Sequence, residues 1–379
     1  MLDSSALADI RAHIRERLGE DSRILKELRS DVRSLAERQR RIRPRAATAV
    51  SLVATDGGNN QLRFDPFLIQ LVRVVDSNQN QRCLEVISPT MPIDKLNRRQ
   101  LDAEGNPQGP LGRMMRDLGV RRLEELSPMI QPGRDGAPRS PSAVQVYREL
   151  MEWAVLYSLL KMDYGSDTLI VFDGNLRSKV FAGELFAQFG KLLETEIARH
   201  AACKRRIFLV GVMKTSKVLD RYRLTMALER VLRTNYPAYV EVPRKLEENV
   251  YLWNEYARGQ DAAEEGGEAA KFVLGKMFFV KFGDRTQDPI WPIDIFETQA
   301  GDADRILSHL LADAKEGFPV PLYPRCLQKA HETAALVGFD MAVLQDSILD
   351  GFRDLLGGEA GTLDVFRLEE NNPAQGRYR

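Results

Sequence analysis

The stretch LIVFDGN, residues 169–175, decides the fold, because four apolar residues run directly into Asp173 and Gly174. A second stretch, AVSLVATDGG, ends in the same way on Asp56 and Gly57. Apolar runs of this kind are typical of strands that are buried on both faces of a sheet. Asp-Gly after a strand can be a simple turn signal. Two copies, each behind a run too apolar to accept an unpaired charge, favour a functional pair of carboxylates.

Further strand patterns flank these two carboxylates. From residue 47, ATAVSLVAT, FLIQLVRVVDS and RCLEVISPT are separated by polar turn clusters, which predicts three antiparallel strands. TLIVFD and RIFLVGVMK follow, joined by a helical pattern, which predicts parallel strands covered by helices. This order describes a ribonuclease H-like mixed sheet with flanking helices, in which the first strand lies beside the fourth.

Helical patterns lie at both ends of the chain. Apolar residues at spacings of three, four and seven predict one helix over 3–45, which Pro44 ends. Its apolar seam fits either a partner helix or packing on its own domain. We therefore expect an N-terminal helical arm over 1–46 and a polar tail over 366–379. Between them, residues 47–365 are expected to form a single α/β domain with a C-terminal helical cap and an acidic flexible loop at 260–270.

Composition excludes several classes of protein. Lys plus Arg and Asp plus Glu both number 54 in 379 residues, so net charge predicts no partner. The three cysteines, Cys83, Cys203 and Cys326, are far apart, which argues against a zinc site or a disulfide framework and favours the cytoplasm. No run of about 18 apolar residues predicts a membrane span.

Asp56 and Asp173 suit metal-dependent chemistry. On neighbouring strands, their carboxylates would lie about 5 Å apart at one sheet edge. Oxygen ligands select Mg²⁺ or Mn²⁺, and such ions can activate a water and stabilise the leaving oxygen in phosphodiester cleavage. The glycine after each aspartate leaves room for a phosphate to approach the backbone.

Three other residues are candidates for the same chemistry. Glu152 lies among apolar positions of the helix pattern before TLIVFD, and Glu149 on the same helix is the alternative metal ligand. Lys214 ends RIFLVGVMK as the aspartates end their strands, so it could hold a phosphate or be a strand-end surface lysine. His331 lies among small apolar residues, and spacing alone favours a core histidine over a ligand.

Four blocks, TDGG, FDGNL, GVMKTSK and YPRCLQKAHETA, together resemble the NurA nuclease family over about residues 47–352. The resemblance implies a ribonuclease H-like nuclease, usually dimeric, that uses Mn²⁺ to digest DNA from 5′ ends. It also implies work with the hexameric HerA translocase in end resection. By this resemblance Asp56 and Asp173 bind metal, His331 is an active-site histidine rather than a core residue, and Lys214 is the basic residue of the fifth strand.

The sequence departs from the family at one motif, because Gly58 stands where the family commonly has serine. A nuclease must also hold its strand, and basic residues that follow the two later strand ends could contact phosphates or be ordinary surface charges. These residues are Arg177, Lys179, Lys217, Arg221 and Arg223. Tyr222 is the one aromatic candidate for base stacking.

We therefore predict a Mn²⁺-dependent (Mg²⁺ possible) DNA nuclease, with Asp56, Asp173, Glu152 and His331 at the metal and Lys214 at the phosphate. It is expected to be a 5′–3′ exonuclease with possible single-strand endonuclease activity. We expect a homodimer that acts with a HerA-type translocase in repair by homologous recombination. The alternatives are an inactive DNA-end clamp or translocase adaptor of the same fold, and an RNA-directed hydrolase.

Overall fold

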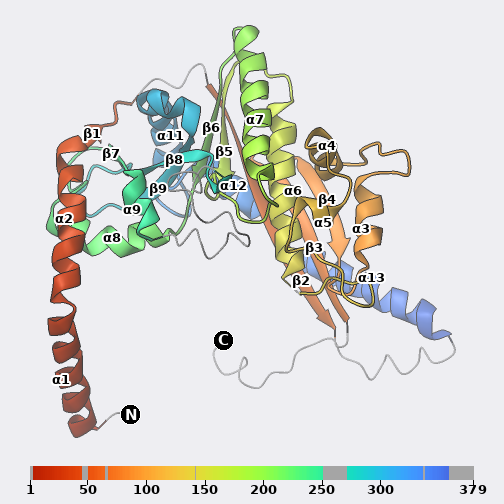
Figure 1. Ribbon diagram of the computed structural model, residues 1–379, viewed down its shortest axis with the longest axis horizontal. Coiled ribbons are helices and arrows are strands. Elements are labelled where there is room, and N and C mark those ends of the chain that lie inside the picture. The colour runs from red at the N-terminus through yellow and green to blue at the C-terminus, as the bar shows by residue number, and fades with distance from the viewer. Residues whose placement is uncertain are drawn as a thin grey trace. The chain divides into compact units, whose positions relative to one another are not determined.

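The computed structural model describes residues 3–44, 50–64, 67–140, 142–250, 271–335 and 338–357 (Figure 1). This part of the chain is a mixed α/β protein with nine strands. The chain divides into two compact units: a first unit of Met1–Ala54 and Leu160–Gln328, and a second unit of Thr55–Leu159 and Lys329–Arg379. The predicted acidic loop at 260–270 and the polar tail at 366–379 lie outside the described residues.

The first unit contains one run of hydrogen-bonded strands. Their order is β1 (Arg40–Arg41), β7 (Ala238–Glu241), β8 (Gly275–Lys281), β9 (Ile290–Phe296), β6 (Ile207–Val212) and β5 (Asp167–Asp173). β5 and β6 are parallel, as predicted, whereas β6 pairs with β9 in the antiparallel direction. Next to β5 in this order comes β2 (Val50–Phe64), of which the first residues, up to Ala54, belong to this unit. The predicted mixed sheet is therefore confirmed, and the first predicted strand lies beside the fourth.

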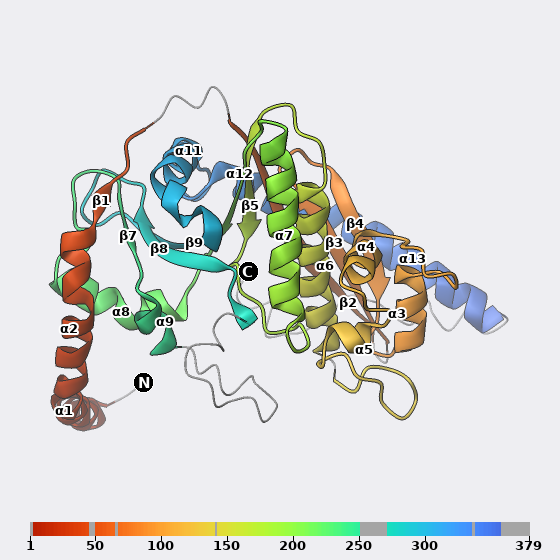
Figure 2. The ribbon, with the colours of Figure 1, turned by 45° about the horizontal axis from the view of Figure 1, so that its top comes forward.

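Helices cover both faces of this sheet (Figure 2). α11 lies on one face, and α8 and α9 lie on the other, while α7 packs against β6. Their bounds are α7 Leu185–Ala202, α8 Lys217–Leu228, α9 Arg244–Glu248 and α11 Ala303–Lys315, and the 3₁₀ helix η2 spans Glu297–Asp302. α8 begins where the Ser216 hydroxyl accepts a hydrogen bond from the Leu219 amide, which caps the helix N-terminus.

The N-terminal arm differs from the single predicted helix. It consists of α1 (Ser4–Glu20) and α2 (Ser22–Arg38), which meet at Asp21, and the chain is extended at Gln39 before it pairs with β7 as β1. The helix thus ends before Pro44, because residues 40–41 make strand hydrogen bonds instead of helical ones.

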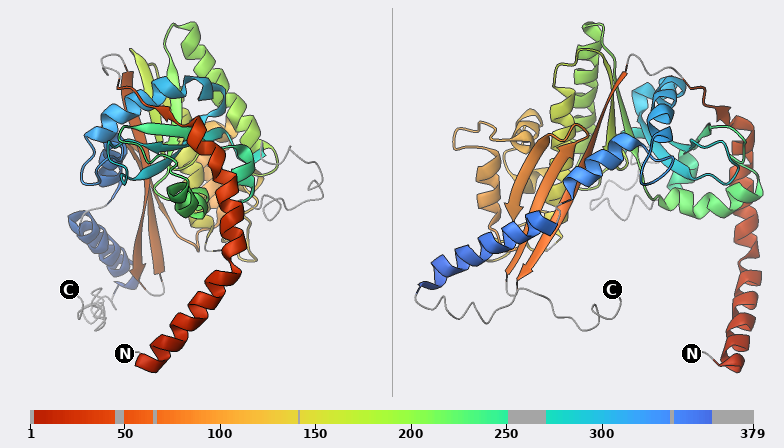
Figure 3. Two further views of the ribbon diagram at one scale, coloured as in Figure 1. Left: turned by 90° about the vertical axis from the view of Figure 1, so that its left-hand side faces the viewer. Right: turned by 180° about the vertical axis from the view of Figure 1, so that it is seen from behind.

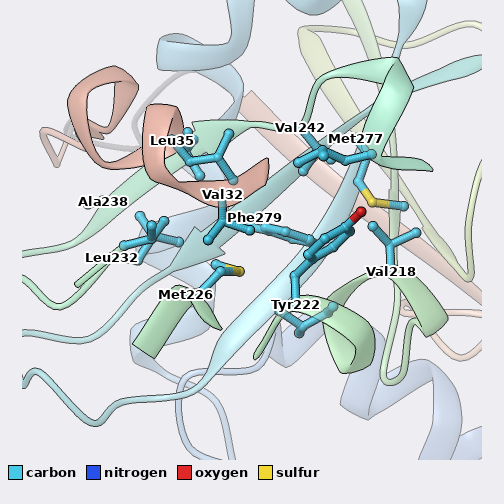
Figure 4. Packing of buried hydrophobic residues seen from close by; sticks show 14 of the residues in the cluster. Val32, Leu35, Val218, Tyr222, Met226, Leu232, Ala238, Val242, Met277 and Phe279 are labelled. Atoms are coloured by element: carbon cyan, nitrogen blue, oxygen red, sulfur yellow. The ribbon is translucent and has the colours of Figure 1, made fainter. Parts of the chain in front are cut away.

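α2 packs on its own unit, which decides between the two alternatives for this half of the arm. Val32 and Leu35 are fully buried in a core cluster with Tyr222 of α8 and Phe279 of β8 (Figure 4). Tyr222 is therefore a core residue and not a platform for DNA bases, so that expectation was wrong. On α1, by contrast, Ile14 and Leu18 are exposed.

The second unit holds the remainder of β2 with β3 (Phe67–Asp76) and β4 (Gln81–Ile87). Both strand pairs are antiparallel, which confirms the predicted meander. The predicted strand end at Asp56 was wrong, because Asp56–Phe64 continue β2 and pair with β3. The buried helix α6 (Ala143–Leu160) lies on one face of these strands, and α13 (Gly338–Leu356) crosses the other face (Figure 3).

Shorter elements complete the described part of the chain. α4 (Pro110–Asp117) and α5 (Leu123–Leu126) are separated by Gly119, which has a φ of 74°. α3 (Ile93–Gln100), β7 and α9 had no prediction, and the C-terminal helical region contains α11, α12 (Arg325–Ala334) and α13. Among the helices that the structure describes, none is both long enough and apolar enough to cross a membrane.

Candidate functional site

The end of β5 carries a small polar cluster in the first unit. The Asp173 side chain, 12% exposed, accepts a hydrogen bond from Lys214 Nζ at 2.7 Å. Its other oxygen accepts one from the Tyr323 hydroxyl at 3.3 Å. Lys214 follows β6, the parallel neighbour of β5, so the two strand ends bring the cation to the carboxylate. The structure thus places the strand-end lysine, which was predicted to hold a phosphate, beside the strand-end aspartate.

The backbone that follows Asp173 is held tightly. Gly174 has a φ of 138°, which favours glycine, and a Cβ on Gly211 would lie 2.5 Å from the Gly174 carbonyl oxygen. The next amide, that of Leu176, donates to Asp294 Oδ2 at 3.0 Å. A Cβ on Gly275 would lie 3.0 Å from the Cβ of Leu176. Two glycines, Gly211 on β6 and Gly275 on β8, thus allow this turn to pack directly on the sheet.

Arg177 is a structural residue and does not fit the predicted contact with DNA. Its side chain is 5% exposed, and its guanidinium binds Asp294 through two hydrogen bonds, at 2.8 and 2.9 Å. It also binds Glu247 at 2.5 Å. Burial alone would lower the pKa of Arg177, but attraction to and hydrogen bonds with Asp294 and Glu247 outweigh burial and raise it. A charge that is buried and paired in this way is not available to a phosphate.

The end of the apolar part of β2 carries a different cluster, in the second unit. Asp56 is 10% exposed, and its Oδ2 lies 2.6 Å from Nδ1 of His331 on α12. The imidazole is 64% exposed. His331 is thus neither a core histidine, as spacing alone favoured, nor remote from the aspartate.

Glu152 of α6 lies against Gly57, the residue that follows this aspartate. A Cβ on Gly57 would lie 2.0 Å from Glu152 Oε1, so the carboxylate of α6 sits directly against the residue after Asp56. Arg148, one turn earlier on α6, is 3.3 Å from the same carboxylate. The structure therefore favours Glu152 over Glu149 as the helical carboxylate near β2.

The remaining predicted DNA contacts lie in the first unit. Lys217, Arg221 and Arg223 are exposed on the first turns of α8, and Arg223 is 3.7 Å from Asp220. Lys179 is half-buried. Exposure is compatible with phosphate contacts, and the three α8 residues remain a prediction.

The donors in the second unit suit a hard divalent cation. Asp56 and His331 offer a carboxylate oxygen and an imidazole nitrogen that lie 2.6 Å apart, whereas Glu152 lies against Gly57, the next residue of the strand. Carboxylate oxygens together with one imidazole nitrogen suit Mn²⁺ better than Mg²⁺, because Mg²⁺ usually takes oxygen ligands alone. The residues present therefore fit the metal that the resemblance implies.

The family is established by comparison with known protein families. The model of the NurA domain matches residues 50–336, which include both strand-end aspartates and His331. The chain belongs to the NurA family. No curated protein matches it.

Solved structures of NurA proteins are similar to this chain at low identity. The crystal structure of the NurA nuclease from Sulfolobus solfataricus has 12% identity and a TM-score of 0.47, with 94% of this chain and 99% of that chain covered. NurA bound to dAMP and manganese has 9% identity and a TM-score of 0.41, with 89% and 94% covered. NurA with manganese has 8% identity and a TM-score of 0.40, with 89% and 98% covered.

Sequence reasoning missed Tyr323 and Arg148, which contact Asp173 and Glu152. A signal for Tyr323 existed, because it opens the same YPRCLQKAHETA block that contains His331. Arg148 precedes Glu152 by four residues, the spacing at which helical side chains of opposite charge meet.

Proposed function

We propose that this NurA-family protein is a metal-dependent DNA nuclease. The observation that carries the proposal is that two apolar strands, β2 and β5, each deliver an aspartate whose neighbours suit phosphodiester chemistry. Asp56 has an imidazole at 2.6 Å, and Asp173 has a lysine ammonium at 2.7 Å.

In this proposal Asp56, Asp173 and His331 bind one divalent cation, and Glu152 is a further donor. Support comes from the donor chemistry, because Asp56, Asp173 and His331 are a candidate metal-binding group among the described residues. Support also comes from chain continuity. Asp56 is two residues beyond Ala54, where β2 is the neighbour of β5 in the strand order, and a strand advances about 3.3 Å per residue.

The bound cation would supply an activated water and stabilise charge on the leaving oxygen. The protein's own residues would do the rest. Lys214 would neutralise a phosphate oxygen, since its side chain is 48% exposed and its ammonium can exchange Asp173 for substrate. Tyr323 would hold the Asp173 carboxylate in orientation through its hydroxyl. The room for a phosphate predicted at Gly57 is instead taken by the Glu152 carboxylate.

The finer features of the proposal follow from the family resemblance. They are a preference for Mn²⁺ over Mg²⁺, digestion from 5′ ends, a homodimer, and action with a HerA-type hexameric translocase in DNA end resection. Size-exclusion chromatography with light scattering tests the dimer. Co-purification with the translocase encoded in the same cell tests the partner.

The test of the activity is incubation of end-labelled single-stranded DNA, duplex DNA and RNA with the protein and Mn²⁺, Mg²⁺ or chelator. We expect DNA cleavage with Mn²⁺, and no cleavage with chelator. DNA binding without cleavage under every condition would instead support an inactive clamp. Preferential cleavage of RNA would support an RNA-directed hydrolase. Labelling the 5′ or the 3′ end distinguishes the two polarities.

A further inference from the structure

The segment between α11 and α12, Gly317–Tyr323, carries an exposed aromatic side chain. Among the exposed large hydrophobic residues that the structure describes, Phe318 has the highest exposed fraction, 82%. Val320 on the same segment is 45% exposed, and Pro319 and Pro321 are exposed as well. Phe318 therefore presents a whole ring to solvent at a position where its burial contributes nothing to folding.

The backbone beneath Phe318 is fixed. Gln328 of α12 accepts a hydrogen bond from the Val320 amide at 2.8 Å and donates to the carbonyls of Val320 and Tyr323, each at 2.9 Å. Gly317 packs so closely on this turn that a Cβ there would lie 2.3 Å from the Tyr323 carbonyl oxygen. Because this backbone is already fixed, the Phe318 segment loses little further conformational freedom when the ring binds a ligand.

The same turn is connected to the candidate active site within the first unit. Tyr323, which ends the segment, donates its hydroxyl to Asp173 at 3.3 Å. Its ring is held edge-on against Trp291 of β9, with 4.9 Å between ring centroids. Gly317, the neighbour of Phe318, contacts the carbonyl of this tyrosine. A short and rigid path therefore links Phe318 to the carboxylate at the end of β5.

We propose that Phe318 is a stacking platform for an unpaired DNA base next to the phosphate that is cleaved. This inference rests on the proposed nuclease function and adds a subsite to it. Every base has an aromatic face, so stacking on one ring holds a strand without regard to sequence. The platform would favour single-stranded or frayed ends over fully paired duplex.

A protein partner is the less favoured occupant. A stable protein interface buries about 800 Å² on each side and needs a broad apolar centre. In the described range 271–335, the exposed large hydrophobic residues are Phe318 and Val320. One ring flanked by Val320 and two exposed prolines is enough for a base but not for an interface of that size.

The test is fluorescence anisotropy of labelled oligonucleotides with the full-length protein in chelator, where DNA is not cleaved. We expect Phe318→Ala to weaken binding of single-stranded DNA by about five- to 150-fold, in line with the loss of one stacked base. Phe318→Trp should bind as well as the wild type or better. Leu355→Ala, which removes a side chain that is 73% exposed on α13, is the matched control and should have no effect.

The outcomes separate the two proposals. If the wild type binds single-stranded DNA and Phe318→Ala binds it equally well, the stacking platform is wrong while the nuclease proposal stands. An equal loss for single-stranded and blunt duplex DNA would also contradict the platform, because only an unpaired base can stack on it. If the wild type binds neither form of DNA and cleaves neither in Mn²⁺, the nuclease proposal itself fails. Thermal melts confirm that the variants fold.

Discussion

Asp173 at the end of β5 and Asp56 within β2 share one local sequence signal, Asp-Gly after an apolar run, but their surroundings differ. Asp173 at the end of β5 faces a lysine and a tyrosine, and a buried ion cluster holds the turn behind it. Asp56 on β2 faces an exposed histidine, and a second carboxylate, Glu152, lies against the next residue. Lys214 beside Asp173 therefore suits an anionic phosphate, and the exposed imidazole beside Asp56 suits a cation. Tertiary neighbours, not the motif, give each aspartate its part of the chemistry.

The largest expected effect comes from removing either carboxylate. We expect Asp56→Asn and Asp173→Asn each to lower cleavage of labelled DNA in Mn²⁺ by about a thousandfold or more, which corresponds to a loss of ~4 kcal/mol of transition-state stabilisation. Asp350→Asn on α13, where the side chain is 70% exposed, is the matched control and should keep full activity. If one of the two aspartates proves dispensable, only one strand end carries the chemistry.

The ion cluster behind β5 should be worth several kcal/mol of stability. Arg177→Met leaves Asp294 and Glu247, 0% and 1% exposed, without their shared cation. Breaking a buried pair in this way costs about 3–5 kcal/mol, which urea denaturation measures directly. Arg223→Met removes an exposed arginine and should change stability by about 0.5 kcal/mol or less. Equal unfolding midpoints for the two variants would refute the structural role of Arg177.

Lys214 should matter for catalysis rather than for folding. Its side chain is 48% exposed, so the pair with Asp173 stabilises the fold by about 1 kcal/mol or less. Loss of a cation that stabilises charge in the transition state should lower kcat by about a hundredfold in Lys214→Ala. Steady-state kinetics on a short DNA substrate measures this effect, and Lys214→Arg should recover part of the rate. A change confined to stability would contradict the assignment.

His331 should affect metal affinity. Because its imidazole lies on Asp56 but is 64% exposed, His331→Ala should leave the fold intact. We expect the affinity for Mn²⁺ to fall by about 10- to 100-fold, as when an ordered group at a metal centre is lost. Isothermal titration calorimetry measures this change. His13→Ala, on exposed α1, is the control. An unchanged affinity would place the metal away from the β2 end.

The smallest effect tests the place of Glu152. Ala at position 57 would put its Cβ 2.0 Å from Glu152 Oε1, so the flexible carboxylate must move. We expect about a tenfold loss in Mn²⁺ affinity at a cost to stability of about 1 kcal/mol. Gly165→Ala is the control, because a Cβ there meets nothing within 4 Å. If Gly57→Ala binds Mn²⁺ normally, Glu152 is not a donor.

Local patterns were enough to predict some parts of the molecule. The strand that ends on Asp173 could be predicted because an apolar run followed by a charge is a local signal. The antiparallel order of β2, β3 and β4 was predicted as well, but the same signal failed at Asp56, because the polar residues that follow it pair with β3 and extend β2 to Phe64.

Features that depend on distant partners could not be predicted. Arg177 was misassigned because its partners Asp294 and Glu247 lie 117 and 70 residues further along the chain. The end of the N-terminal arm depends on β7, some 200 residues away, with which Arg40 and Arg41 pair. Tyr222 was misassigned because its burial depends on α2 and β8.

The central claim is that Asp56 and Asp173 bind the same divalent cation. The most direct test is a Mn²⁺ titration, followed by electron paramagnetic resonance, of the wild type, Asp56→Asn, Asp173→Asn and the double variant. If both carboxylates hold one ion, each single change should remove most of the affinity and the double variant should lose little more, so the effects are strongly non-additive. Losses that add independently, or a single variant that binds Mn²⁺ like the wild type, would contradict the account.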